Sequence, residues 1–165
     1  MKKAKNSPRA VRWLRLAEDA GACAKRVAHY QELERRGKLT ADAVESEDAV
    51  WVLCYIPDGL LSEADVRALM ARVTESREAA EVLRYAPGDR LSEADASALV
   101  PLVSGSGGAA EVLRYAPAGR LSVADVRALL ARVSDSWDAS WVLRRAPAGR
   151  LAAADVARLK ALAAQ

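Results

Sequence analysis

The feature that most constrains this chain is an interval of 30 residues at which the same residue types return. The recurring positions are Leu61, Leu91, Leu121 and Leu151, Pro57, Pro87, Pro117 and Pro147, and Asp65, Asp95, Asp125 and Asp155. A fixed interval of this size indicates a stack of similar units, because a single unit cannot bury its apolar face without its neighbours. The repeat therefore predicts the architecture. It does not predict the function, since repeat stacks serve as general binding surfaces.

Each unit is expected to hold two helices. Ser62 and Asp65 have the spacing of a capping box and mark the start of the first, here called helix A. One face of its 3.6-residue period carries the apolar side chains of Val66, Leu69, Met70 and Val73. The second, helix B, ends before proline, which removes a backbone donor. We expect its N-cap to be the serine that returns at Ser46, Ser76, Ser106 and Ser136.

These patterns predict an all-α fold, an α-solenoid of helical hairpins. Residues 1–45 are expected to form a basic N-terminal arm and a helical cap, and residues 46–165 the tandem repeats. The last copy stops after a helix A that should act as the C-terminal cap. There Ala152 replaces the capping serine, and Lys160 takes a position that is apolar in other copies, so we expect Lys160 on an outer face.

One copy departs from the others between residues 101 and 108. Pro101 stands where helix A continues in other copies, and Gly107 and Gly108 replace larger residues at the start of helix B. This copy is predicted to be the loosest. Two interpretations stay open, a hinge or cleared patch for a partner on one hand and drift in a loop on the other.

Charge and composition limit the classes of partner. The net charge is +3, and the excess lies in the first 51 residues, so the repeats carry no basic stripe of the kind that follows a phosphate backbone. Neither a secretory segment nor an apolar run long enough to span a membrane is expected. Cys23 and Cys54 are too few and too far apart for a disulfide framework, which favours free thiols in the cytoplasm.

The residue inventory gives little support for an enzyme. His29 is the single histidine and is expected to be an ordinary surface residue. The aspartates of the repeat are expected to stabilise the first turns of helices rather than to form an acidic array. Phosphate-binding glycine motifs are missing. We therefore expect no catalytic residues, no cofactor and no metal.

The strongest functional candidate is the solvent side of helix B, where three columns of side chains are predicted. They hold Trp51, Glu81, Glu111 and Trp141, then Cys54, Arg84, Arg114 and Arg144, and then Tyr55, Tyr85, Tyr115 and Arg145. Trp, Tyr and Arg are the residue types that most often carry binding energy. One hypothesis is a concave face that grips a protein or peptide. The other is that the rings lie half-buried between helices while Glu81 and Glu111 pair with arginines.

The repeat also resembles known families. The unit Ala-x-x-Val-Leu-Arg-Tyr-Ala-Pro, followed by Leu-Ser-x-Ala-Asp-Val-Arg-Ala-Leu-Leu, is similar to HEAT-like repeats and to the variant leucine-rich repeats of bacteria, from about Ser46 to Leu162. This resemblance implies right-handed stacking of helix pairs and a binding or scaffolding role.

Two alternatives to protein binding remain at this point. Nucleic acid could be bound by a basic arm and a row of corner arginines, which are Lys2, Lys3, Lys5, Arg9, Arg12 and Arg15, and Arg90, Arg120 and Arg150. The neutral repeats argue against it, and an arginine at a corner can instead bond the last carbonyls of a helix. Self-association through the ends of the stack is the second alternative.

Overall fold

The computed structural model describes residues 28–29, 32, 35–36, 45–55 and 61–165, and the predicted N-terminal arm and cap lie almost entirely outside these ranges, Cys23 included. All regular secondary structure in the described ranges is helical, which confirms the all-α class. The elements are α3 (Ser46–Tyr55), α4 (Glu63–Met70), α5 (Ser76–Tyr85), α6 (Glu93–Leu99), the 3₁₀ turn η2 (Val100–Leu102), α7 (Ser106–Tyr115), α8 (Val123–Arg132), α9 (Ser136–Arg145) and α10 (Ala153–Ala163).

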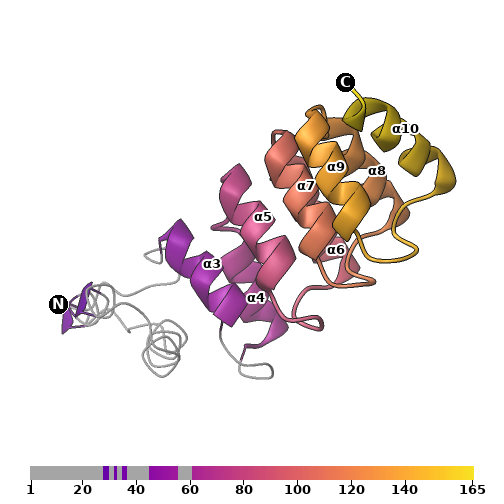
Figure 1. Cartoon of the computed structure of the whole chain (residues 1–165). Coiled ribbons are helices and arrows are strands. Elements are labelled where there is room, and N and C mark those ends of the chain that lie inside the picture. Colours follow the sequence, from indigo (N-terminus) through magenta and orange to yellow (C-terminus); the bar gives the residue numbers. More distant parts are fainter. Residues whose placement is uncertain (1–27, 30–31, 33–34, 37–44, 56–60) are drawn as a thin grey trace. The chain divides into compact units, whose positions relative to one another are not determined.

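The chain divides into two compact units. The first unit, Met1–Val73, contains α3 packed against α4, and the second unit, Thr74–Gln165, contains α5 to α10. In the second unit α7 packs between α5 and α9, while α8 packs on α7 and α10 packs on α9 (Figure 1). The odd-numbered helices are thus the predicted helix B and the even-numbered ones helix A. The most deeply buried leucines of the second unit are Leu83, Leu99, Leu113, Leu129 and Leu159.

Capping boxes start α4, α6 and α8, as the sequence predicts. In α8 the Asp125 amide donates to Ser122 Oγ at 3.1 Å, and Ser122 N donates back to the Asp125 carboxylate at 3.0 Å. A further bond of 2.7 Å comes from Ser97 Oγ on α6, so the cap also joins two copies. Burial opposes ionisation of Asp125, but the hydrogen bonds from Ser122 and Ser97 outweigh it and hold the pKa of this carboxyl below its usual value.

The serines of helix B are not N-caps, and this prediction was wrong. Ser76 and Ser106 are the first residues of α5 and α7, whose N-caps are Glu75 and Gly105. The Ser76 hydroxyl instead accepts a hydrogen bond of 2.7 Å from the amide of Ser104, in the loop of the next copy. Ser106 does the same for the loop that precedes α9. The hydroxyls serve this purpose because those loop amides have no partner within a helix.

The corner arginines cap a helix of the preceding copy. Arg120 is only 5% exposed, and its guanidinium donates to the carbonyls of Leu83, at 3.2 Å, and Pro87, both at the end of α5. Arg150 repeats this arrangement at the end of α7, bonding the Leu113 carbonyl at 2.7 Å. These bonds satisfy carbonyls that a helix end leaves unpaired. The alternative use foreseen for a corner arginine is therefore confirmed at both positions.

Pro101 shortens helix A of its copy without disrupting the helix that follows. The α-helical part ends at Leu99 and continues as the turn η2, which contains the proline. Gly105 then adopts φ +79°, and α7 runs its full length from Ser106. A side chain added at Gly107 would meet only the Asp138 carboxylate, at 4.0 Å. There is thus open space between this copy and α9. The expectation that this copy is the loosest one stays a prediction.

Candidate interaction surface

The helix-B side chains of the second unit form an alternating stack of rings and guanidinium groups. The Arg84 guanidinium lies over the Tyr85 ring at 4.6 Å and over the Tyr115 ring of the next helix at 5.3 Å. Arg114 lies between Tyr115, at 4.5 Å, and Trp141 on α9, at 4.2 Å. We call this set the cation–π ladder, and its members are Tyr85, Arg84, Tyr115, Arg114, Trp141 and Arg144.

Polar contacts fix the arginines of the cation–π ladder in place. Arg84 and Arg114 each donate to the hydroxyl of the tyrosine that follows them in sequence, at 2.5 and 2.6 Å respectively. Arg84 also forms an ion pair with Glu111 on α7. A guanidinium held by rings on both sides and by a hydroxyl has little rotational freedom left to lose on binding.

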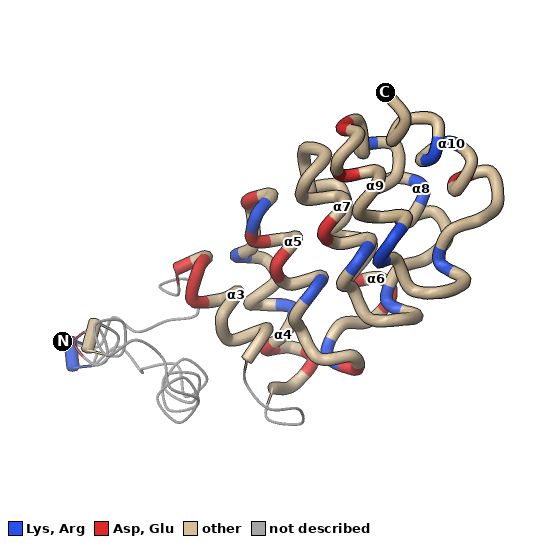
Figure 2. Tube along the Cα trace, in the orientation of Figure 1, with Lys and Arg blue, Asp and Glu red and all other residues tan. Residues whose placement is uncertain are grey.

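Exposure of the cation–π ladder agrees with parts of both hypotheses for helix B. The Arg84 side chain is 17% exposed and Glu111 pairs with it, as the half-buried interpretation expects. Tyr85 and Tyr115 nevertheless expose 48% and 49% of their surface. Aromatic rings that are this open and also held in place provide the kind of contact area found at binding hot spots. The last turns of α5, α7 and α9 each contain arginine, namely Arg84, Arg114, and Arg144 with Arg145, and Figure 2 shows blue segments at these C-terminal ends as well as near the start of α5.

In the first unit the structure brings together two of the predicted site residues and corrects a third position. Trp51 and Tyr55 pack on each other within α3, with ring centroids 5.8 Å apart. Cys54 was placed on the solvent side, but it is buried, with 6% of its surface exposed. The helices α3 and α5 each bury five residues, and the small thiol of Cys54 is covered at a register where α5 carries the longer side chain of Arg84.

The part of the cation–π ladder between α5 and α7 differs in charge from the part between α7 and α9. Glu111 on α7 faces Arg84, but the equivalent residue on α9 is Trp141, so Arg114 meets a ring in place of a carboxylate. Sequence reasoning also left out Trp137, which is 66% exposed and lies 5.6 Å from Trp141 between ring centroids. The sequence did contain a signal for Trp137, because a large ring at this register replaces Gly107 of the preceding copy.

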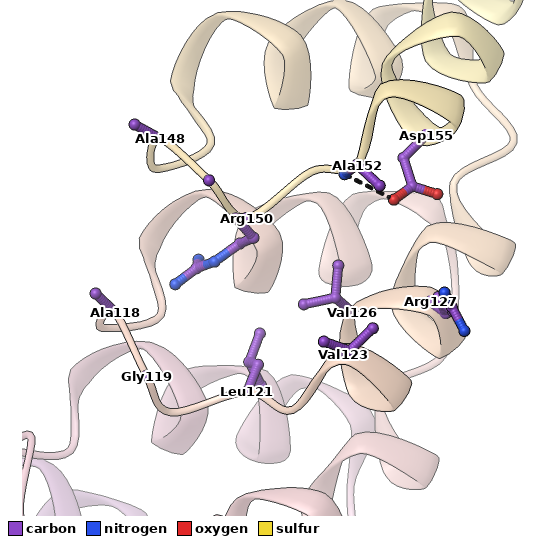
Figure 3. Close-up of a pocket in the computed structure, with 11 residues that line it drawn as sticks. Ala118, Gly119, Leu121, Val123, Val126, Arg127, Ala148, Arg150, Ala152 and Asp155 are labelled. Atoms are coloured by element: carbon purple, nitrogen blue, oxygen red, sulfur yellow. Dashed lines mark hydrogen bonds between the residues drawn. The ribbon is translucent and has the colours of Figure 1, made fainter.

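A pocket of about 340 Å³ lies elsewhere in the second unit, between two corner loops and α8 (Figure 3). Two of its polar side chains, those of Arg150 and Asp155, already have structural roles. Arg150 bonds the carbonyls at the end of α7, and the Asp155 carboxylate accepts the Ala152 amide at 3.0 Å. The rest of the lining is largely apolar side chains and backbone, so the pocket offers little chemistry of its own.

A metal-binding cluster and a membrane-spanning helix are both missing from the described ranges. These ranges hold no cluster of three or more His, Cys, Asp or Glu side chains that could bind a metal ion. None of the described helices has both the length and the apolar character needed to cross a membrane. The chain matches no protein-family model, no curated protein and no solved structure. The case for a function therefore rests on the geometry of the cation–π ladder.

Proposed function

We propose that this chain is a non-enzymatic scaffold, a right-handed α-solenoid that binds another protein or a peptide through the exposed face of helix B, and that it works in the cytoplasm. The observation that carries the proposal is the cation–π ladder on α5, α7 and α9. A surface formed of half-exposed tyrosines, a tryptophan and immobilised arginines resembles the composition of interface hot spots.

Bonds between successive copies support the solenoid part of the proposal. Ser97 of one hairpin bonds Asp125 of the next, and Ser76 bonds the loop of the following copy. Arg120 reaches back in the same manner to the end of α5. Each hairpin of the second unit thus uses its neighbour to satisfy its polar groups as well as to bury its apolar ones, which is typical of stacked repeats.

Preorganisation supports the binding part. An exposed arginine normally loses side-chain entropy when it is fixed in a complex, at a cost of about 0.5–1.5 kcal/mol. Arg84 and Arg114 are already fixed between rings in the free protein. A partner that contacts the cation–π ladder would therefore gain contact energy with little ordering cost. An enzymatic role has no comparable support among the described residues.

Nucleic-acid binding, the alternative, loses part of its basis. Arg120 and Arg150 were candidates for contacts with phosphates, but their guanidinium groups bond carbonyls of the chain itself. Of the other candidates, Arg90 lies within the described residues, and those of the N-terminal arm lie outside them. A gel-shift assay with random duplex DNA over a range of salt concentrations tests the alternative, since phosphate contacts produce a steep salt dependence.

The proposal is tested by capture of partners on the immobilised full chain. The variant combines Arg114→Ala with Tyr115→Ala, which removes the centre of the cation–π ladder while leaving the buried leucines intact. The control combines Val123→Ala with Arg127→Ala, two exposed positions on α8. Both variants are first checked for native helix content by circular dichroism.

We expect proteins retained from a cell lysate by the wild-type chain and by the control to be lost from the Arg114/Tyr115 variant. Quantitative mass spectrometry of the retained proteins provides the measurement. Equal retention by all three chains would show that the cation–π ladder is not the binding surface.

A further inference from the structure

Between α7 and α9, the arginines of the cation–π ladder carry positive charge that no described carboxylate pairs with. On α5 and α7, Arg84 is neutralised by Glu111. On α7 and α9, Arg114 lies over Trp141, and within the described part of the chain it has no ion pair. Arg144 is over the same ring at 5.4 Å, also without a described carboxylate. Positive charge is therefore concentrated at one end of the surface.

Two further residues extend this end. Arg145 occupies the position that holds tyrosine in the preceding copies, and it is exposed. Trp137 exposes 66% of its surface one turn before Trp141. We define the α7–α9 patch as Arg114, Tyr115, Trp137, Trp141, Arg144 and Arg145. It combines three guanidinium groups with three aromatic rings.

Nearby carboxylates do not cancel this charge. Asp135 is the N-cap of α9, at the far end of the helix from Arg144, and its carboxylate accepts the Trp137 and Asp138 amides at 2.8 and 3.1 Å. Glu111 is bound to Arg84. Asp135 and Asp138 lie at the N-terminus of α9, where the helix dipole favours acids, so within the patch they flank Trp137 and are a helix length away from Arg144 and Arg145.

We propose that the α7–α9 patch binds an acidic peptide segment of the partner. Carboxylates of the peptide would pair with Arg114, Arg144 and Arg145. Apolar side chains of the peptide would lie against the exposed ring of Trp137 at one end of the patch and against that of Tyr115 at the other. This inference rests on the proposed function and names the chemistry of its partner. The argument for an acidic segment is charge complementarity with the three arginines. Such charged groups contribute mainly to specificity and association rate, whereas the rings supply contact area.

The same surface disfavours a long polyanion. Glu81 and Glu111 continue the face toward α5 and would repel phosphates that followed the cation–π ladder beyond the patch. Arg120 and Arg150 are engaged with carbonyls. The positive region is thus limited to the neighbouring helices α7 and α9, and its short extent suits a short acidic segment better than a nucleic-acid backbone.

The test measures fluorescence anisotropy of a short fluorescein-labelled peptide that alternates Glu and Leu, titrated with the full chain. Three other probes accompany it, the same peptide with Gln for Glu, the same peptide with Lys for Glu, and oligothymidylate of equal length. We expect the acidic peptide to bind about tenfold more tightly than the Gln peptide, with the difference reduced at high salt, and the Lys peptide not to bind.

A pair of variants with the same charge change locates the site. Trp141→Glu recreates the carboxylate that Glu111 provides one copy earlier and should weaken binding of the acidic peptide about tenfold. Val123→Glu introduces the same charge at a position on α8 that is 69% exposed, and should leave binding unchanged. If Trp141→Glu loses helix content, Arg145→Tyr replaces it, because it restores the residue of the preceding copy and removes a single charge.

Three results would overturn the inference: equal binding of the acidic and Gln peptides, equal effects of Trp141→Glu and Val123→Glu, or tighter binding of oligothymidylate than of the acidic peptide. Failure of this inference can be separated from failure of the proposed function. If the Arg114/Tyr115 variant still loses a captured protein while the acidic peptide does not bind, the surface is a binding site for a partner of different chemistry.

Discussion

The corners of the repeat and the exposed face of helix B use the same residue types for different purposes. At the corners, Arg120 and Arg150 occupy one register and make equivalent bonds to the carbonyls of the preceding helix B. On the helix-B face, the residues at one register change from Glu111 to Trp141. The corner position thus repeats from copy to copy, whereas the helix-B face keeps its arginine column from α5 to α9 but changes at the register of Glu111 and Trp141. Under the proposed function, this register is where we expect a partner to distinguish one copy from another.

Substitution of a corner arginine should give the largest effect. Arg120→Met keeps much of the apolar stem and removes the guanidinium that bonds the end of α5. We expect a loss of about 2–3 kcal/mol in the free energy of unfolding, the range for buried hydrogen bonds to a charged group. Urea denaturation followed by circular dichroism provides the measurement.

The matched control for this substitution is Arg145→Met on the exposed face, which should change the free energy of unfolding by less than about 0.5 kcal/mol. The comparison between corner and face would fail if the two arginine variants were equally destabilised.

Glycines at the corners should show a smaller, conformation-dependent effect. Gly119 has φ +79°, and Gly119→Ala should cost about 1–2 kcal/mol even though no atom crowds the added Cβ. Gly88 has an ordinary φ and open space, and its register holds Ala118 in the next copy. Gly88→Ala is therefore expected to be neutral or to stabilise by about 0.4–1 kcal/mol. Thermal unfolding of the two variants in parallel measures the difference, and an equal loss in both would contradict a role for φ.

The smallest effect is expected at the capping carboxylate of α8, with a defined pH dependence. Asp125→Asn should cost about 1 kcal/mol at neutral pH, the usual contribution of a cap. Because the pKa of Asp125 is lowered in the folded chain, its ionised form stabilises the fold above the unfolded pKa of about 3.9. That contribution is lost as the pH falls through the lower, folded pKa. Unfolding curves of wild type and Asp125→Asn should thus converge toward acid pH, and a constant difference from neutral to acid pH would contradict this account.

Much of the fold could be predicted from sequence because its determinants are local. The capping box at Ser122 and the proline that ends helix B involve residues a few positions apart, where spacing alone implies the geometry. Even the corner arginine was foreseen as a carbonyl ligand, because a helix end leaves carbonyls unpaired.

The features that could not be predicted depend on residues roughly one repeat apart. Ser76 was expected to cap its own helix, but its partner is a loop amide 28 residues away. Cys54 was expected at the surface because the residues at its register in other copies are arginines, but a thiol is small and apolar enough to be buried where an arginine side chain is not. The cation–π ladder was predicted only as columns of residues. That each guanidinium lies between rings of successive helices depends on how those helices pack, and no local pattern contains that information.

The bonds between copies have a consequence for how such a chain can grow. In the second unit Ser76 and Ser106 each find their partner 28 residues ahead, and Arg120 and Arg150 each bond carbonyls 33 and 37 residues behind. Since these two kinds of bond recur at the same separations along the chain, in-frame duplication of one copy would supply the new hairpin with both of them. Tandem duplication could thus lengthen the helix-B face, and substitutions could then diversify its side chains one at a time.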